Sequence, residues 1–366
     1  MIGGRCRLEN FSGGVNMFDL GLILGPSETT RCDDFRLGGA VVRYDERLHC
    51  WRMWYYCRDQ SFPAEIAPAF GTGTIATAVS NDGLRWQREV GPLQGGAVFA
   101  PSDDASAFDC LHVATGDIVR WKDRWLMVYF GGSRQVPQGA FEMYTHPGYL
   151  LRLGLAESVD GVNWSRLPGD GPGGSIVDVD DSIVYAAFPG FVALDDRLLI
   201  HYTGVDKRGR FHFTRVVASD RDLTAWAPAP EFVFTRDPDL HESAGIITRD
   251  IVENPLHEGG RWLMVYTARD GRPETGERRS ICAAFSDDLV TWTPRGRTPF
   301  FTVGPQGAWD SAGVATARLV VTPEDFRLYY YGWSNNSYVG HPGRGIGCAV
   351  SANQSLDDFR RVDLNS

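Results

Sequence analysis

Three short patterns recur in a fixed order, and this repetition constrains the fold more than any other feature of the chain. The first pattern is an acid ahead of an apolar strand, in FDCLHVATGDIV (108–119), HESAGIITRDIV (241–252) and WDSAGVATARLV (309–320). In each copy Ile or Val stands four residues after the acid, Thr six residues after it, and an apolar pair nine and ten residues after it.

The other two patterns follow each acid-led strand. One alternates large apolar residues, which suits a strand with one face in a core; its copies are WRMWYY (51–56), RWLMVYFGG (124–132), RLLIHYTG (197–204), RWLMVYTA (261–268) and FRLYYYG (326–332). The other is an Asp-containing turn before an aromatic residue, typical of a tight hairpin; its copies are SNDGLRW (80–86), SVDGVNW (158–164), SDRDLTAW (219–226), SDDLVTW (286–292) and SLDDF (355–359).

Five copies, about 60–80 residues apart, predict an all-β protein: a five-bladed β-propeller with four-stranded antiparallel blades around a central channel. We expect one domain over residues 1–366, and a strand within 17–24 that closes the ring against the last blade. The alternative is an all-β sandwich with strands that look alike by chance. The expected blades are 28–92, 93–170, 171–231, 232–298 and 299–362.

Charge and composition narrow the choice of partners and compartment. The formal net charge of −10 argues against nucleic acid or an anionic membrane as a partner. No apolar run is long enough for a transmembrane helix, and the first residues lack the apolar core of a signal peptide. The seven cysteines form no CxxC pair, so we expect reduced thiols in a cytoplasmic protein.

In a propeller the first strand of each blade lines the channel, so the acids that precede these strands should surround one mouth of it. Crowded carboxylates push one another's pKa values apart, which supplies an acid and a base for cleaving a glycosidic bond. We therefore predict Asp34, Asp109 and Glu242 as catalytic residues, and Asp181 and Asp310 as substrate-binding residues. The alternative for each acid is a structural role in capping a turn or bonding to a neighbouring blade.

The loops between the second and third strands should open on the same mouth, and they are long and rich in aromatic residues, Arg and Gly. Long loops that converge on one face usually serve binding. Trp309, Trp333 and Tyr338 are candidates for stacking on a sugar ring.

These patterns resemble the five-bladed β-propeller glycosidases, namely glycoside hydrolase families 43, 32, 68 and 130 and their uncharacterised relatives. The resemblance extends from about Asp33 to Phe359 and implies a glycosidase with Asp and Glu on successive inner strands, often within an Asp-Pro pair. This chain has LGGAVV (37–42), TGDIV (115–119) and FPGFV (188–192) at those places. Only TRDIVENP (248–255) looks like the family's Arg-Asp motif, which implies that Arg249 and Asp250 bind sugar hydroxyls.

Histidines and glycine-rich loops add little. The eight histidines form no HxxxH or HxH pair, so we expect no metal and no cofactor, although His112 and His241 face the predicted mouth and are assigned to substrate binding. GGAV and GTGT lack the lysine and the strand–helix context of a phosphate loop.

Three functions remain open. The first is a carbohydrate-active enzyme that cleaves or transfers at a glycosidic bond of a small glycoside; within this class a phosphorylase could use Arg36, Arg249 and Arg344 to hold phosphate. The second is a non-sugar enzyme on the same propeller, such as a cyclase or lyase of a biosynthetic pathway, favoured by the aromatic loops. The third is a non-catalytic sugar-binding propeller.

Overall fold

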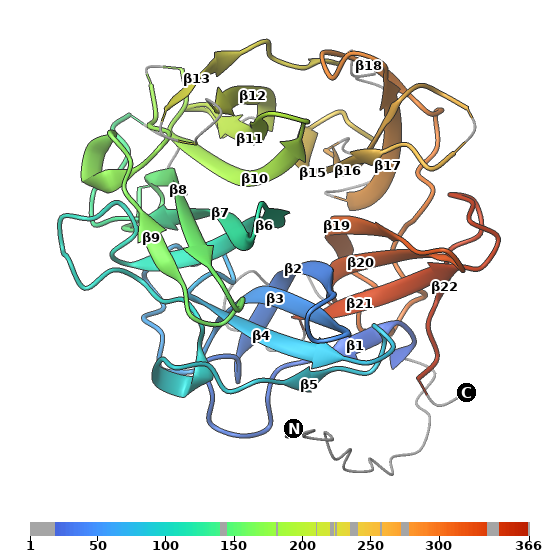
Figure 1. Cartoon of the computed structure of the whole chain (residues 1–366), viewed down its shortest axis with the longest axis horizontal. Coiled ribbons are helices and arrows are strands. Elements are labelled where there is room, and N and C mark those ends of the chain that lie inside the picture. The colour runs from blue at the N-terminus through green and yellow to red at the C-terminus, as the bar shows by residue number, and fades with distance from the viewer. Residues whose placement is uncertain are drawn as a thin grey trace.

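The chain folds into β-sheets arranged around a central axis, as the computed structural model shows (Figure 1). The structure describes residues 19–139, 145–180, 182–209, 211–219, 223, 225–234, 241–256, 258–271, 278–334 and 344–364. Within these residues α-helix is absent, and helical structure is limited to short 3-10 turns such as η2 (Gln94–Gly96) and η4 (Pro172–Gly174). The predicted all-β, propeller-like architecture is confirmed.

The strands form four sheets, and the first two are in chain order from the inner strand outward. The first two sheets contain β2 (Arg36–Asp45), β3 (Cys50–Arg58), β4 (Thr74–Ser80) and β5 (Gln87–Arg88), then β6 (His112–Trp121), β7 (Arg124–Gly132), β8 (Leu151–Ser158) and β9 (Ser165–Leu167). The five-stranded sheet contains β1 (Leu22–Leu24), β19 (Gly313–Val321), β20 (Phe326–Trp333), β21 (Arg344–Ser351) and β22 (Arg360–Arg361).

The remaining sheet has nine strands: two antiparallel runs, β10–β13 and β15–β18, and the short strand β14, which pairs parallel with β18. These runs meet through a single parallel pair, Phe211 with Gly245. Its strands are β10 (Tyr185–Ala193), β11 (Leu198–Val205), β12 (Phe211–Ser219), β13 (Trp226–Ala229), β14 (Val233–Phe234), β15 (Gly245–Glu253), β16 (Trp262–Asp270), β17 (Arg278–Ser286) and β18 (Thr291–Pro294).

The strands nearest the axis are those that the acid-led pattern predicts. β2 contacts β6, β6 contacts β10, β10 contacts β15, β15 contacts β19, and β19 contacts β2, so these inner strands close a ring. Each of them has a register shift in its middle, which turns the side chains there toward the axis. The shifts fall at Gly38/Val41, Thr115/Asp117, Ala187/Gly190, Ile246/Arg249 and Ala315/Arg318.

The Asp-containing turns form as predicted. In the first sheet the Asp82 carboxylate accepts hydrogen bonds from the backbone N–H groups of Leu84 and Arg85, both at 2.8 Å. Gly83 has a φ of 75°, the left-handed region that glycine tolerates best. Tyr329 of β20 donates its hydroxyl to the Gly83 carbonyl at 2.8 Å, so this turn also fastens the first sheet to the last.

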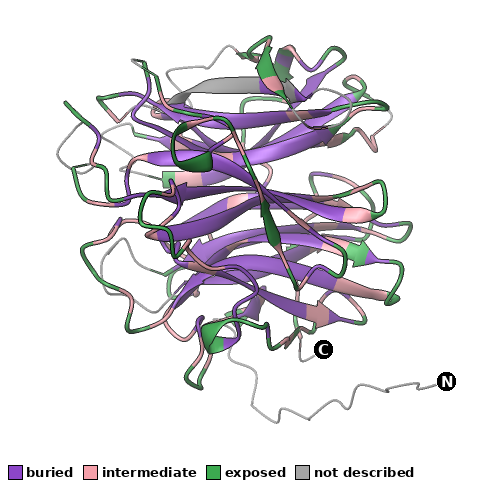
Figure 2. Cartoon of the chain, turned by 60° about the vertical axis from the view of Figure 1, so that its left-hand side comes forward, coloured by how far each residue is buried: buried purple, intermediate pink, exposed green. Residues whose placement is uncertain are grey.

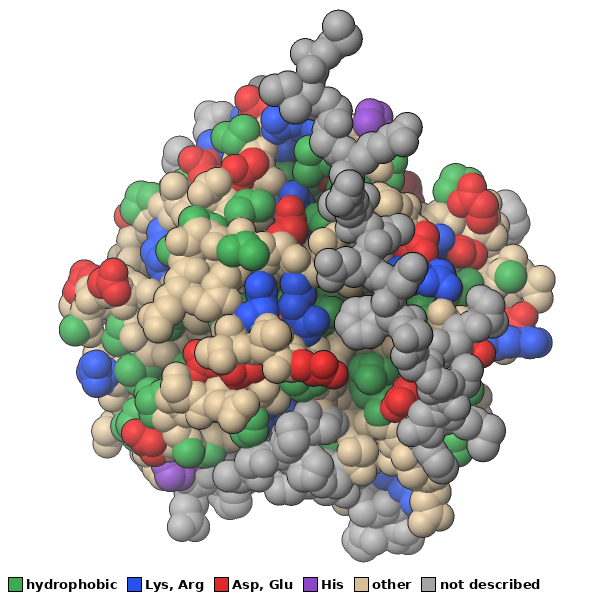
Figure 3. Space-filling view, turned by 90° about the horizontal axis from the view of Figure 1, so that it is seen from below, with side chains coloured by type: hydrophobic (Ala, Val, Ile, Leu, Met, Phe, Trp, Pro, Cys, Tyr) green, Lys and Arg blue, Asp and Glu red, His purple; other side chains and the backbone are tan. Residues whose placement is uncertain are grey.

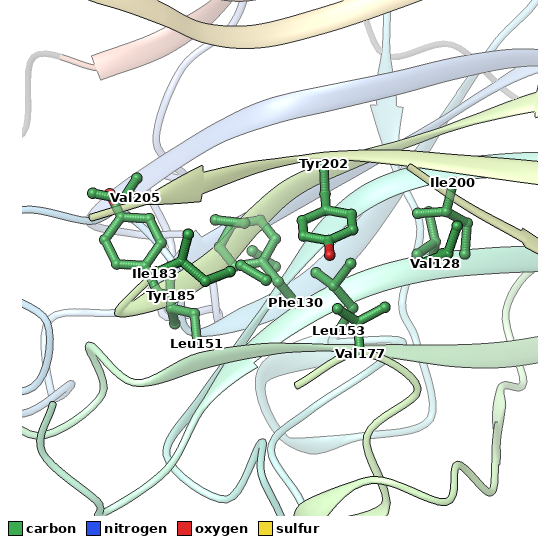
Figure 4. Close-up of a cluster of buried hydrophobic side chains, with 14 of the residues drawn as sticks. Val128, Phe130, Leu151, Leu153, Val177, Ile183, Tyr185, Ile200, Tyr202 and Val205 are labelled. Carbon is green, nitrogen blue, oxygen red and sulfur yellow. The ribbon is translucent and has the colours of Figure 1, made fainter. Parts of the chain in front are cut away.

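The ring is closed by the N-terminal strand. β1 pairs antiparallel with β21, Leu22 opposite Gly347, which confirms the expectation that a strand within 17–24 joins the last sheet. The inner strands are buried almost throughout, and exposure is concentrated in the outermost strands and the connections (Figure 2). Apolar side chains fill the space between neighbouring sheets, as Figure 4 shows for Phe130, Leu153, Ile200 and Tyr202.

The outer surface is mixed in charge. On the face in Figure 3, Lys and Arg side chains alternate with Asp and Glu, and no extended basic surface appears there. No helix in the described ranges is both long and apolar enough to cross a membrane. The six cysteines within those ranges are free thiols.

Candidate functional site

A pocket of about 170 Å³ lies at one end of the central channel, where inner strands begin and second strands end. Its walls come from β3, β10, β15, β16, β17, β19, β20 and β21 and from the segments 69–72 and 145–150. The lining residues are Tyr56, Ala69, Phe70, Gly71, Thr72, Tyr149, Tyr185, Phe188, Ile247, Arg269, Arg279, Ala315, Thr316, Tyr331, Trp333 and Arg344. Among these described residues there is no carboxylate.

Aromatic rings make one wall of the pocket. Phe70 packs against Tyr149 with ring centroids 5.3 Å apart, and against Tyr185 and Phe188 at 6.3 and 6.4 Å. The backbone N–H of Ala69 donates to the Tyr149 hydroxyl at 3.0 Å, so the connections after β3 and β7 hold each other in place. These two long loops therefore meet at one mouth of the channel, as predicted. Their aromatic side chains form an apolar wall there.

Three arginines make the opposite wall. Arg269 of β16 and Arg279 of β17 stand directly opposite each other in the ladder, an arrangement of like charges that weakens a sheet unless something offsets it. The Arg279 guanidinium lies over the Trp333 ring, 5.1 Å from its centroid. Arg344 donates to the Tyr331 hydroxyl at 2.8 Å. Trp333, a predicted sugar-stacking residue, lines this pocket.

Two further arginines lie behind the lining segment 69–72. Arg36 donates to the Phe70 carbonyl at 3.4 Å, and Arg58 donates to the Thr72 carbonyl at 2.6 Å. Burial is the main cause that lowers the pKa of Arg58, to about 9, and Arg36 and Arg344 lower it further. Burial and the nearby Arg344 also lower the pKa of Arg36. Positive charge therefore accumulates around this end of the channel.

The floor of the pocket is built from the shifted positions of the inner strands. A smaller cavity of about 20 Å³ lies there, between Gly39, Thr115, Phe188, Thr248 and Thr316. It shares Phe188 and Thr316 with the larger pocket, so the two spaces adjoin. The positions where the family resemblance implies carboxylates thus carry Gly, Thr and Phe in this chain.

Arg249 lines this floor, whereas Asp250 is engaged in a buried network. Arg249 donates to the Thr203 hydroxyl at 2.8 Å, and burial lowers the pKa of Arg249 to about 9. Asp250 accepts from Arg318 at 2.8 Å and from the Leu319 backbone N–H at 2.8 Å. Arg318 also lies 3.7 Å from Asp117 and donates to the Gly116 carbonyl, so it bridges opposite sides of the ring.

Asp109 and Asp310 lie inside their sheets rather than in the pocket, and Asp33 is placed in the same way. Asp109 is 1% exposed, and its Oδ2 accepts from the Tyr129 hydroxyl at 3.0 Å and from Arg166 at 2.9 Å. The same cluster recurs twice, as Asp33 with Tyr55 and Arg88 and as Asp310 with Tyr330 and Arg361. Each ties the start of an inner strand to the second and outermost strands of its own sheet. We call these three groups the Asp–Tyr–Arg clusters.

Glu242 and Asp34 differ in their surroundings, and neither of them lines the pocket. Glu242 is buried and accepts from the Tyr266 hydroxyl at 2.7 Å, while Pro294 occupies the ladder place of the cluster arginine. Asp34 is half-buried and accepts from the Gln60 backbone N–H at 2.9 Å. Asp181 and Tyr338 fall outside the described residues. The assignment of Asp34, Asp109 and Glu242 as catalytic residues therefore stays a prediction.

The remaining predicted residues lie near the pocket without lining it. Trp309 stacks on Tyr330 at 5.6 Å and donates its indole N–H to the Leu20 carbonyl at 3.0 Å. His241 is half-buried. No group of three or more His, Cys, Asp or Glu in the described ranges is arranged to hold a metal ion.

His112 is fully buried between the connections that form the aromatic wall. Its Nε2 lies 2.9 Å from the Gly148 carbonyl, which can only accept, so Nε2 donates and Nδ1 accepts from the Thr72 hydroxyl at 2.9 Å. Burial is the main cause that lowers the pKa of His112, to about 4. His112 is therefore a neutral residue that links Thr72 and Gly148 behind the pocket wall.

The functional features that sequence reasoning missed are the pocket arginines Arg269 and Arg279 and the cluster arginines. A signal for the second group was present, because Arg88, Arg166 and Arg361 each stand two residues after the aromatic residue that ends the turn pattern. The absence of that arginine after Trp292, where Pro294 stands, was equally visible. The sequence patterns did not show which side of its strand each of these residues faces.

No protein-family model matches the sequence, and no curated protein is significantly similar to it. Solved structures match over nearly the whole chain. One comes from the family 130 of mannoside phosphorylases, described as containing glycoside hydrolases that target β-1,2-mannosidic linkages in Candida mannan; it is 15% identical, with a TM-score of 0.63, over 96% of this chain and 99% of that one.

Two further structures extend the comparison. A thermostable family 43 glycoside hydrolase is 12% identical, with a TM-score of 0.59, over 92% of this chain and 97% of that one. An N-acetylgalactosamine deacetylase from F. plautii, in complex with blood group B trisaccharide, is 17% identical, with a TM-score of 0.59, over 91% and 94%. At these identities the likeness shows the fold, and the chain has the propeller fold of these glycoside hydrolases.

Proposed function

We propose that this protein is a carbohydrate-active enzyme that processes a small glycoside in the pocket at the mouth of a single five-bladed propeller. The nine-stranded sheet counts as two blades in this proposal, because its two runs share only the pair Phe211–Gly245. The closed ring of five inner strands supports the same count.

One observation carries the proposal: the pocket opens at the hub of a glycosidase-type propeller and has a wall of aromatic rings. Sugar rings present apolar C–H faces that pack on flat aromatic side chains, while arginines donate hydrogen bonds to ring hydroxyls. A volume of about 170 Å³ is below the roughly 300–1,000 Å³ of pockets for drug-sized ligands, so the described space suits one sugar-sized ring.

Cleavage of a glycosidic bond by two carboxyl groups requires them on either side of that bond. Asp34, Asp109 and Glu242 remain the predicted catalytic residues, and the contacts of Asp109 support a fastening role in addition. A matched pair separates these roles, because Asp310 makes the same two kinds of contact as Asp109.

The test is turnover of a panel of 4-nitrophenyl glycosides by the wild type, Asp109→Asn and Asp310→Asn, each normalised to the folded fraction. If Asp109 is catalytic, its variant loses activity by about 100-fold or more, a larger loss than that of Asp310→Asn. Equal activities of the two variants would remove Asp109 from the mechanism. Absence of wild-type turnover together with absence of binding of every glycoside would overturn the proposed function.

A non-sugar enzyme, such as a cyclase or lyase, is the second candidate. The observation that favours it is the absence of a carboxylate among the described lining residues, next to aromatic walls that suit an apolar substrate. Binding of aromatic compounds that carry no sugar, with no binding of glycosides, would select this function. The predicted cytoplasmic location stays a prediction.

A further inference from the structure

Two buried cysteines of the first sheet lie in direct contact. Cys57 of β3 donates its S–H to the Sγ of Cys32, with the two sulfurs 3.8 Å apart, and neither residue is more than 3% exposed. We propose that Cys32 and Cys57 are a modification site, at which oxidation forms an intrachain disulfide that fastens the segment before β2 to β3. This inference is independent of the proposed function.

The first sheet departs here from what its related sheets carry. Cys32 directly precedes the acid of an Asp–Tyr–Arg cluster, and Cys57 stands two residues after the tyrosine of that cluster. The equivalent residues are Phe108 and Gly131 in the second sheet and Trp309 and Gly332 in the five-stranded sheet. The contact between two thiols is therefore not a requirement of the fold.

Formation of the disulfide needs a small movement of one partner. An S–S bond is about 2.05 Å long, so the two sulfurs must approach by roughly 1.8 Å. Cys57 is held in β3 by its pairing with Leu37 and Thr74 of the two neighbouring strands. Cys32 lies in the segment 25–35, which contains no strand and is exposed at 28–30. Local opening of this segment lets Cys32 move and gives a small oxidant access to it.

The two thiols differ in acidity, which sets the order of the steps. The hydrogen bond from Cys57 is the main cause that lowers the pKa of Cys32, whereas burial raises the pKa of Cys57. The Cys32 thiolate attacks a low-molecular-weight disulfide, such as glutathione disulfide, forms a mixed disulfide and releases one glutathione thiolate. Cys57 then loses its proton and attacks the Cys32 sulfur, which releases the second glutathione thiolate. Overall, two thiols are oxidised and one glutathione disulfide is reduced to two glutathione molecules, which carry the two protons.

The disulfide would act on the pocket through β3. Tyr56, the residue before Cys57, lines the pocket. Arg58, the residue after it, donates to the Thr72 carbonyl at 2.6 Å behind the lining segment 69–72. A covalent bond at Cys57 restrains this part of the wall, and it also limits the freedom of the unfolded chain, which stabilises the fold.

The test is to count thiols in the full-length protein before and after incubation with glutathione disulfide. The protein is unfolded, alkylated and weighed, and its sequence has seven cysteines. We expect seven alkyl groups on the reduced protein, two fewer after oxidation, and a peptide in the digest that links Cys32 to Cys57. The oxidised protein should unfold at a temperature about 3–6 °C higher. Dithiothreitol should reverse both changes.

Two serine variants assign the reaction to the pair. Cys57→Ser removes the second thiol, so Cys32 should keep one glutathione as a mixed disulfide, and the unfolding temperature should not rise. Cys348→Ser is the matched control, because Cys348 is also fully buried in a strand but donates to the Ala349 carbonyl instead of a thiol. This variant should form the Cys32–Cys57 linkage as the wild type does.

Several results would overturn the inference. These are seven remaining thiols in wild-type protein after treatment that oxidises free dithiothreitol, a linked peptide that joins other cysteines, and loss of two thiols by Cys57→Ser. A mixed disulfide on wild-type Cys32 that never closes also overturns it, because the two sulfurs then do not meet in solution. If Cys57→Ser does not fold, the linked peptide in the wild type and in Cys348→Ser decides the question.

Discussion

The start of β6 and the start of β15 follow the same sequence pattern but are fastened differently. At β6, Asp109 is tied to Tyr129 and to Arg166 of the outermost strand. At β15, Glu242 accepts a hydrogen bond from Tyr266. Pro294 stands at the position that corresponds to Arg166, because Arg166 pairs with Ala156 in one sheet and Pro294 pairs with the equivalent Ala284 in the other. A cavity of about 510 Å³ borders Pro294 and Cys282 on that side.

This difference teaches that one recurring acid can have different electrostatic surroundings in different sheets. An aspartate neutralised by a neighbouring arginine inside a sheet stabilises the sheet. At β15 the acid is a glutamate, and Pro294 stands in the ladder place of that arginine. Glu242 is therefore the acid in which a role other than fastening is best tested.

The largest expected effect is the loss of a cluster carboxylate. Asp109→Asn leaves Arg166 without its ion-pair partner and weakens the hydrogen bond from Tyr129, which should lower the free energy of unfolding by about 3 kcal/mol. Asp310→Asn should match this within about 1 kcal/mol because its contacts are equivalent. Denaturant unfolding measures both, and a cost for Asp109→Asn below about 1 kcal/mol would contradict the fastening role.

The next effect concerns pH and arises at His112, near Asp109. The folded-state pKa of His112 is about 4, below its ordinary 6.5, so the unfolded state binds more protons between these values and stability falls as pH falls through that window. Between pH 6.5 and 5 the loss amounts to about 2 kcal/mol.

Unfolding curves at several pH values test this assignment. His112→Gln should flatten the acid limb of the stability profile. Profiles that coincide for the wild type and His112→Gln would show that the imidazole does not titrate differently on folding.

A smaller effect is expected at Glu242. Glu242→Gln keeps an oxygen that accepts from Tyr266 and breaks no pair at the ladder place of Pro294, so the cost should be about 1 kcal/mol. Denaturant unfolding beside Asp109→Asn gives the comparison directly. A cost as large as that of Asp109→Asn would reveal a strong cationic partner and remove the contrast between the two sheets.

The smallest effect comes from rebuilding the missing arginine. Pro294→Arg places a guanidinium beside the cavity and should stabilise the fold by less than about 1 kcal/mol, since the new side chain must also be ordered. A double-mutant cycle with Glu242→Gln gives the coupling energy. A coupling of zero would mean that the arginine does not reach the glutamate.

Much of the fold could be predicted from the sequence because its patterns are local. The alternation in WRMWYY and the Asp turns gave the strands and hairpins, and their order gave the propeller-like arrangement. The division into four sheets, with one parallel pair joining two runs, could not be predicted, because it depends on a contact between Phe211 and Gly245 that no local pattern encodes.

The site was predicted less well. The direction of the mouth and the long aromatic loops were foreseen, and Trp333 and Arg344 line the pocket. The acids were placed at the mouth because the sequence shows that they precede the inner strands. The sequence does not show in which direction their side chains point. Tyr55 and Tyr56 illustrate the limit: adjacent in sequence, one binds Asp33 and the other lines the pocket, since alternate side chains face opposite ways.

The pairing of β1 with β21 has a consequence for how the molecule is made. Leu22 is translated well before its partner Gly347, because the strands of all the other sheets lie between them in the chain. During synthesis β1 therefore stays unpaired while the intervening sheets form. The ring of sheets closes only after β21 has been made. A pause or truncation late in translation therefore leaves an open arc with an exposed strand edge, the form most prone to aggregation.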